Sequence, residues 1–193
     1  MSSPMPSRIS RGKPPAKKLK HSNYRDALPA LLRDFKGRCA YSMQHHEICG
    51  VLSMEIDHFD PTLKGSRRHR YENLFPATHH CNNAKRDNWP TAGDRRNGLR
   101  ILNCCEEEDY GVHLFEDPDT HLLVGGTPAG HYHIEVCDLN APHFVRERRL
   151  RSTLKHFVEE VPVTVSGDLD DFSDKFNRLR KHLDLLIPPI PAP

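Results

Sequence analysis

The sequence predicts an α+β protein with an N-terminal helix, a small mixed core and a C-terminal extension of a short β-hairpin and two helices. Residues 54–59 alternate between apolar and polar side chains, which is typical of a strand. Residues 78–87 have the length and the N-terminal cap of a short helix. Apolar residues recur at helical spacing over 24–36 and again over 168–187.

Local signals justify each element of the predicted core. A helix over 24–36 has leucines on one face and ends at Gly37, with Pro29 near its first turn. The strand over 54–59 points Ile56 inward, and the proline, glycine and basic residues that follow it predict a loop. Thr78 is the expected cap of the short helix, which ends before Pro90.

The extension is predicted from weaker patterns. Strands are expected at Tyr110–Phe115 and His131–Val136, on either side of a glycine-rich turn. Helices are expected over Asn140–Val161, with Asn140 as the cap, and over Asp168–Ile187.

Charge divides the chain into four expected segments: a disordered basic arm at 1–22, a core at 23–100, a packed extension at 101–187 and a proline-rich tail at 188–193. The whole chain has 28 Lys and Arg against 26 Asp and Glu, and a net charge of +2 gives little reason to expect that it binds nucleic acid. Locally, however, nine basic residues face three acids over 64–100, whereas 101–140 holds nine acids and no Lys or Arg. Phosphate groups respond to such local fields.

Other classes of protein are excluded by composition. No apolar run approaches the roughly 20 residues of a membrane helix, and the basic N-terminus has no apolar signal core. A cytoplasmic protein is therefore expected, in which the six cysteines are reduced thiols or metal ligands.

The residues whose types and spacing point most clearly to a catalytic role lie between 55 and 85. Asp57 and Asn82 offer a carboxylate and an amide oxygen, which are hard ligands suited to Mg²⁺ or Mn²⁺. His80 and Asn83 are the alternatives to Asn82, because the helical register decides which side chain faces the ion. His58 points to the other side of the strand, where it can deprotonate water.

The chain resembles the HNH, or ββα-metal, endonuclease family in three spaced parts: Asp57-His58, Asn73-Leu74 and Cys81-Asn82-x-x-Lys85. The resemblance implies that His58 is the general base and that Asn73 braces the metal loop and the base. It also implies that Asp57 and Asn82 hold the ion and that DNA is cut, with RNA as an alternative substrate. Residues 38–41, 102–107 and 137–140 are similar to stand-alone HNH nucleases of bacterial antiphage systems, the retron-associated and Septu-type proteins. A regulatory protein partner is expected, because a nuclease with little sequence readout would damage its host.

Two further sets of residues are candidates. Phosphate contacts are expected from basic side chains around the motif: Lys64, Arg67, Arg68, Arg70, Lys85 and Arg86. A structural zinc is not favoured, because the family's Cys-x-x-Cys knuckles are half missing; a substitute site would use a nearby histidine and three thiols: Cys39, Cys49 and Cys81. The alternative to an enzyme is a non-catalytic nucleic-acid-binding or scaffold module with a decayed metal site.

Overall fold

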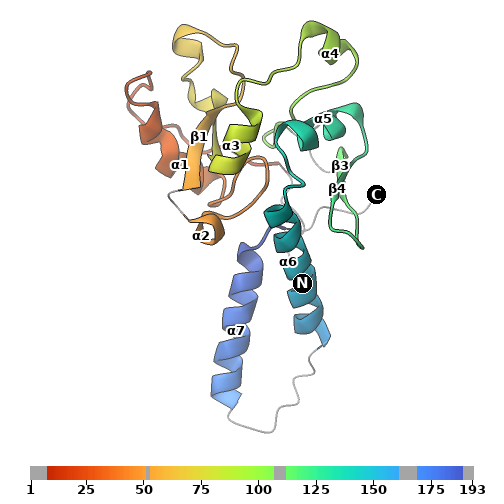
Figure 1. Ribbon diagram of the computed structural model, residues 1–193. Helices are drawn as coiled ribbons and strands as arrows, with labels where there is room; N and C mark the ends of the chain where they lie inside the picture. The colour runs from red at the N-terminus through yellow and green to blue at the C-terminus, as the bar shows by residue number, and fades with distance from the viewer. Residues whose placement is uncertain (1–7, 51–52, 107–111, 161–168, 189–193) are drawn as a thin grey trace.

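The computed structural model describes residues 8–50, 53–106, 112–160 and 169–188, which form helices and two small antiparallel sheets (Figure 1). This mixture agrees with the predicted α+β class. Residues 1–7 of the arm, 110–111 of an expected strand and 189–193 of the tail lie outside the described residues. In the part of the chain that is described, no helix has the length and apolar character needed to cross a bilayer.

Two strands and two helices make up the centre of the molecule: α1 (Leu28–Asp34), β1 (Met54–His58), β2 (Leu74–Thr78) and α3 (His79–Lys85). β1 and β2 are antiparallel, with Asp57 opposite Phe75, and α3 begins directly after β2. The hydroxyl of Thr78 accepts a hydrogen bond from the backbone N–H of Cys81, so the predicted cap is confirmed. Pro29 lies in the first turn of α1, as its fixed φ favours.

Short helices connect these elements: η1 (Tyr24–Ala27), α2 (His46–Cys49), η3 (Gly65–Arg67), η4 (Tyr71–Asn73) and α4 (Ala92–Arg96). The long connection between β1 and β2 contains η3 and η4, and it was predicted as a loop. This connection carries most of the basic residues next to the motif, so its course decides which of them face the end of β1.

The described end of the basic arm lies against the core, and the expectation of disorder is wrong for residues 8–12. The backbone N–H of Ile9 donates to the carbonyl of Cys104 at 2.7 Å, and the Ile9 side chain is buried. Arg11 donates to the carbonyls of Tyr71 and Leu74, each at 3.0 Å. Its guanidinium also stacks over aromatic rings of the core, which lets a charged side chain contribute to packing.

The hairpin of the extension pairs different residues from those predicted. β3 (Leu114–Glu116) pairs with β4 (Leu123–Gly125), and the segment expected as the second strand belongs to α5 (Pro128–Val136). Thr127 caps this helix by accepting from the backbone N–H of Gly130, and Pro128 occupies its first turn. The cap and the proline favour a helix more strongly than the alternating pattern of His131–Val136 favours a strand, because both stabilise the first turn of the helix.

The C-terminal helices, α6 (Pro142–Glu160) and α7 (Leu169–Leu185), run antiparallel and extend away from the rest of the chain (Figure 1). Arg38 fixes the end of α7 by donating to the carbonyls of Leu185 at 3.3 Å and Leu186 at 3.1 Å. The carboxylate of Glu147 accepts from the backbone N–H of Ile187 at 2.9 Å and from the amide of Gln44 at 2.6 Å. The helix pair is therefore anchored to the core at one end.

Asn140 has a different role from the predicted helix cap. Its side chain accepts from the backbone N–H of Leu123 at 2.8 Å and donates to the Leu123 carbonyl at 2.9 Å. It also accepts from the guanidinium of Arg148 at 3.1 Å. Asn140 thus joins β4 to α6. Its side-chain amide pairs with the N–H and the carbonyl of Leu123 as the backbone of a neighbouring strand would.

Buried His133 on α5 makes the stability of the fold depend on pH. The side chain is 3% exposed and its Nδ1 accepts from the backbone N–H of Leu102 at 3.2 Å. Burial lowers the pKa of His133 to about 3 from its ordinary 6.5. The unfolded state therefore binds an extra proton between these two pH values, so stability falls as the pH falls below about 6.5, at up to about 1.4 kcal/mol per pH unit.

We expect His133→Gln to flatten this part of the pH dependence, because glutamine keeps a polar side chain that does not titrate. The free energy of urea unfolding, measured at several pH values between about 5 and 7.5, checks this result. His131→Gln is the control, because His131 is exposed on the same helix. A His133→Gln protein that loses stability with acid as steeply as the wild type would contradict the assignment.

Candidate active site

A polar cavity of about 290 Å³ lies between the end of β1, the loop after it and α3. Its walls include both predicted metal ligands, the predicted base, one alternative ligand and two predicted phosphate contacts: Asp57, His58, Asn82, Asn83, Arg68 and Arg86. These residues come from three separate segments, so the fold brings together side chains that the sequence only suggested as a set.

His58 has the protonation state that a general base needs. Burial is the main cause that lowers the pKa of His58 to about 4, and the nearby positive charge of Arg68 adds to it. At neutral pH the imidazole is therefore uncharged and has a lone pair. Its Nε2 lies 3.0 Å from Nδ1 of His69, so one ring nitrogen is already held by a hydrogen bond.

Asp57 is held on one side by buried partners. Its Oδ2 accepts from the hydroxyl of Tyr41 and lies 2.9 Å from Nζ of Lys85. Both contacts involve the same oxygen, which leaves Oδ1 as the atom that can bind a cation in the cavity that Asp57 lines. Burial and the adjacent Asp57 carboxylate raise the pKa of Tyr41 well above its ordinary value, so the phenol stays a donor.

Lys85 differs from its prediction. It is completely buried, pairs with Asp57 and donates to the backbone carbonyl of His58 at 3.2 Å. The expectation that it contacts phosphate is wrong, because its side chain is completely buried against Asp57 of β1 and does not line the cavity. Lys85 instead neutralises the inner oxygen of Asp57.

Asn82 is oriented by a carboxylate. Its Nδ2 donates to Glu55, which directs Oδ1 of the amide away from that carboxylate. Glu55 also accepts from Nδ1 of His79 at 2.6 Å. Burial would raise the pKa of Glu55, but the hydrogen bonds from His79 and Asn82 outweigh it and lower the pKa below its ordinary value. Glu55 is thus an ionised carboxylate that fixes the amide.

The two alternatives to Asn82 are separated by the structure. Nε2 of His80 lies 2.9 Å from the carboxylate of Asp138, and its ring contacts His143, so it faces the extension and does not line the cavity. Asn83 does line the cavity, and its Nδ2 lies 2.7 Å from Nε2 of His79. Asn82 and Asn83 therefore both remain candidates for the second ligand.

Asn73 braces the loop that follows β1. Its Oδ1 accepts from the backbone N–H of Asp60 at 2.9 Å, and its Nδ2 donates to the carbonyls of Asp60 and Arg68 at 3.2 and 2.9 Å. Because all of its hydrogen-bonding groups are directed to this loop, Asn73 fixes the chain between His58 and the basic residues. This position agrees with the bracing role that the motif implies.

The basic residues of the loop divide into two groups. Arg68 lies in the cavity wall, where it donates to the carbonyl of Pro61 at 2.8 Å, and Arg86 lines the same wall. The remaining predicted phosphate contacts are exposed outside the cavity: Lys64, Arg67 and Arg70. A positive surface therefore extends from the cavity along the loop.

The candidate zinc residues do not assemble into a site within the described residues. Cys39 and Cys81 are buried, and Cys39 Sγ accepts from the backbone N–H groups of Tyr41 and Ser42 at 3.4 Å. The described part of the chain has one group with metal-binding spacing, and it contains neither these thiols nor Cys49. The substitute zinc set is therefore not formed.

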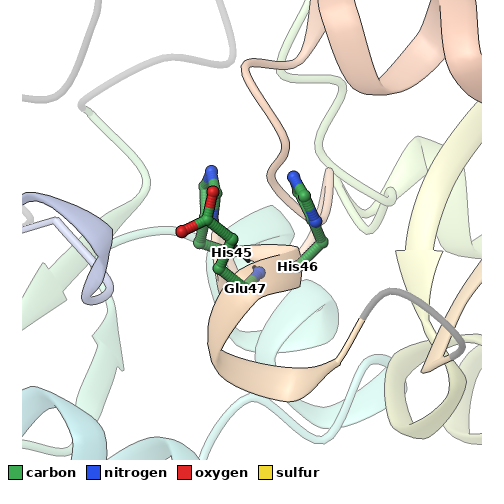
Figure 2. Close-up of side chains that lie close together, drawn as sticks. All are labelled: His45, His46 and Glu47. Atoms are coloured by element: carbon green, nitrogen blue, oxygen red, sulfur yellow. Dashed lines mark hydrogen bonds between the residues drawn. The ribbon is translucent and has the colours of Figure 1, made fainter. Parts of the chain in front are cut away.

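That group consists of His45, His46 and Glu47, whose side chains project from the start of α2 (Figure 2). Its ligand atoms lie within 4.8 Å of one another, so the cluster could hold a metal. Nδ1 of His45, however, accepts from the backbone N–H of Glu47, and the carbonyl of Lys36 also hydrogen-bonds this ring. Binding a metal through His45 would therefore break one of these hydrogen bonds.

Three contributors to the site were missed or undervalued from the sequence. No individual role was predicted for Tyr41, Glu55 or His69. Glu55 had a usable signal, because it shares a strand face with Asp57. The other two had none, because their contacts depend on how distant segments pack.

Comparisons of the chain with protein-family models, with curated proteins and with solved structures gave no match. The function must therefore be inferred from the side chains of the cavity and from the motif that they form.

Proposed function

We propose that the chain is a metal-dependent HNH endonuclease that hydrolyses phosphodiester bonds in DNA, with β1, β2 and α3 as its ββα-metal core. The observation that carries this proposal is the cavity shared by Asp57, His58 and Asn82. It combines oxygen ligands for a divalent ion with a neutral imidazole. Arg68 and Arg86 in the same wall supply positive charge for a phosphate.

The residues of the cavity fit a hard divalent cation. Asp57 and Asn82 would hold Mg²⁺ or Mn²⁺ through their Oδ1 atoms, and both are oxygen donors of the kind these ions prefer. A bound ion would stabilise negative charge on the phosphate and on the leaving oxygen. Lys85 and Glu55 orient the two ligands, since each binds the ligand side chain through the atom that does not face the ion.

In the proposed reaction, His58 takes a proton from a water molecule in the cavity. The water oxygen forms a bond to phosphorus as the bond between phosphorus and the leaving oxygen breaks. Arg68 and Arg86 hold the phosphate in place during this exchange, and they contact the backbone of the nucleic acid without reading its bases. Asn73 keeps the loop that carries Arg68 at a fixed distance from His58.

Purified protein should cleave supercoiled plasmid in the presence of Mg²⁺ or Mn²⁺ and stop when EDTA is added. Asn82→Ala should raise the Mg²⁺ concentration needed for half-maximal cleavage by about tenfold or more, because it removes a ligand oxygen. Asn88→Ala is the matched control, because Asn88 is exposed and does not line the cavity. Asn83→Ala, assayed in parallel, decides between the two adjacent amides.

A panel of single- and double-stranded DNA and RNA, assayed with each metal, identifies the substrate. Metal-dependent cleavage of RNA alone would move the proposal from DNA to RNA. Wild-type protein that binds nucleic acid but cleaves no member of the panel with either metal would contradict the proposal and favour a non-catalytic binding module.

A further inference from the structure

His69 is the closest polar partner of the proposed base. Its Nδ1 lies 3.0 Å from Nε2 of His58, and its side chain is only 9% exposed. The loop that carries it is fixed by the hydrogen bond from Asn73 to the carbonyl of Arg68, the residue directly before His69. The contact therefore joins two side chains whose backbones are both held in place.

Aromatic side chains fix the orientation of the two imidazoles. Tyr24 stacks on His69 with 5.3 Å between ring centroids, and its ring lies 4.9 Å from that of His58. His21 lies 5.6 Å from His69 and 6.4 Å from Tyr24, so it belongs to the same cluster of rings. Rings packed in this way cannot rotate freely, so the hydrogen bond between the histidines has a defined direction in space.

The hydrogen bond between the two rings limits the tautomer of the base. A base that takes a proton from water is neutral, and a neutral imidazole has one N–H group and one lone pair, so a hydrogen bond between two such rings joins the N–H of one to the lone pair of the other. If His69 donates, Nε2 of His58 accepts, its Nδ1 carries the hydrogen, and no lone pair remains for water. If His58 donates from Nε2, its Nδ1 has the lone pair.

We propose that His69 is a positioning residue that accepts a hydrogen bond from Nε2–H of His58 and so makes Nδ1 the proton-accepting atom. This inference rests on the proposed nuclease function. When His58 takes a proton on Nδ1, its Nε2–H can still donate to His69, so the interaction survives the transfer and the ring does not turn. The role resembles that of any buried group that selects the tautomer of a catalytic imidazole.

Two substitutions separate positioning from packing. His69→Leu removes the acceptor but keeps an apolar side chain of similar size, and we expect kcat for plasmid cleavage to fall about 10- to 100-fold with little change in KM. His69→Asn places an acceptor oxygen near the position of Nδ1 and should retain activity within about threefold of wild type. His131→Leu, which removes an exposed imidazole from α5, outside the cavity, is the matched control.

A second readout does not depend on cleavage. The ¹⁵N shifts of the histidine rings in metal-free protein report tautomers directly, and we expect His58 of the wild type to be in the Nε2–H form. His69→Leu should mix the tautomers of His58, whereas His69→Asn should preserve the Nε2–H form. A wild-type His58 in the Nδ1–H form overturns the inference whether or not any variant folds.

The outcomes distinguish this inference from the proposed function. If the wild type fails to cleave, the nuclease proposal fails, while the tautomer measurement still decides the role of His69. If the wild type cleaves and folded His69→Leu cleaves at the same rate with His58 still in the Nε2–H form, the positioning role is wrong and the nuclease proposal stands.

Discussion

Replacement of His58 by alanine is expected to reduce the rate of metal-dependent cleavage by about 10²- to 10⁴-fold, the usual contribution of a positioned general base. The ring is the group in the cavity that can take a proton from water at neutral pH, because its environment keeps it uncharged. Binding of DNA should change little, because the proposed phosphate contacts are Arg68 and Arg86 and not His58. Single-turnover cleavage rates and gel-shift affinities measure the two effects separately.

The control for this loss is His131→Ala, which removes an exposed imidazole from α5, outside the cavity. Both variants should be purified by the same protocol, so that a contaminating host nuclease would appear equally in each. Cleavage by His58→Ala at the wild-type rate would show that another group takes the proton. That result would not bear on the metal dependence of cleavage, which the Asn82→Ala variant tests.

Lys85→Met is expected to destabilise the fold by about 3–5 kcal/mol, the range seen when one partner of a buried ion pair is removed. Lys85 is completely buried and Asp57 nearly so, so the substitution leaves the inner oxygen of the carboxylate, Oδ2, with Tyr41 as its remaining partner. The free energy of urea unfolding measures the effect. Arg86→Met is the matched control, because Arg86 is the next residue and is exposed.

A double variant tests whether the loss comes from the uncompensated charge. Asp57→Asn combined with Lys85→Met removes both charges and keeps an acceptor for the hydroxyl of Tyr41. We expect it to recover a large part of the stability lost in Lys85→Met, because no ion then remains buried. If Lys85→Met unfolds at the same urea concentration as Arg86→Met, the ammonium group does not pair with Asp57 in a dry environment.

Local sequence signals predicted the parts of the core whose formation is decided locally. The cap at Thr78, the strand predicted over 54–59 and the helix predicted over 24–36 all depend on neighbours in the chain. The cap is confirmed, and the strand and the helix form over Met54–His58 and Leu28–Asp34. The gathering of Asp57, His58 and Asn82 in one cavity follows from these elements, because β1 and α3 are joined through β2. The catalytic roles of these residues and the role in antiphage defence stay predictions.

Features that depend on tertiary packing were predicted poorly. The spacing of Asn82 and Lys85 placed them correctly on one helix face, but their spacing does not reveal how deeply each end of that face is buried. Arg11 was predicted to belong to a disordered arm, yet its guanidinium lies over the ring of Phe75. In both cases segments distant in sequence cover a basic side chain, completely at Lys85 and partly at Arg11, and composition alone predicts exposure.

The anchoring of α7 by Arg38 has a consequence for how the chain folds during synthesis. The carbonyls of Leu185 and Leu186 leave the ribosome long after residue 38, so the guanidinium must wait for partners separated from it by most of the chain. Contacts between residues so far apart in the sequence form late, and they slow the last step of folding. Until then Glu147 also lacks the N–H of Ile187, so both polar groups that hold the end of α7 lack their partners in the nascent chain.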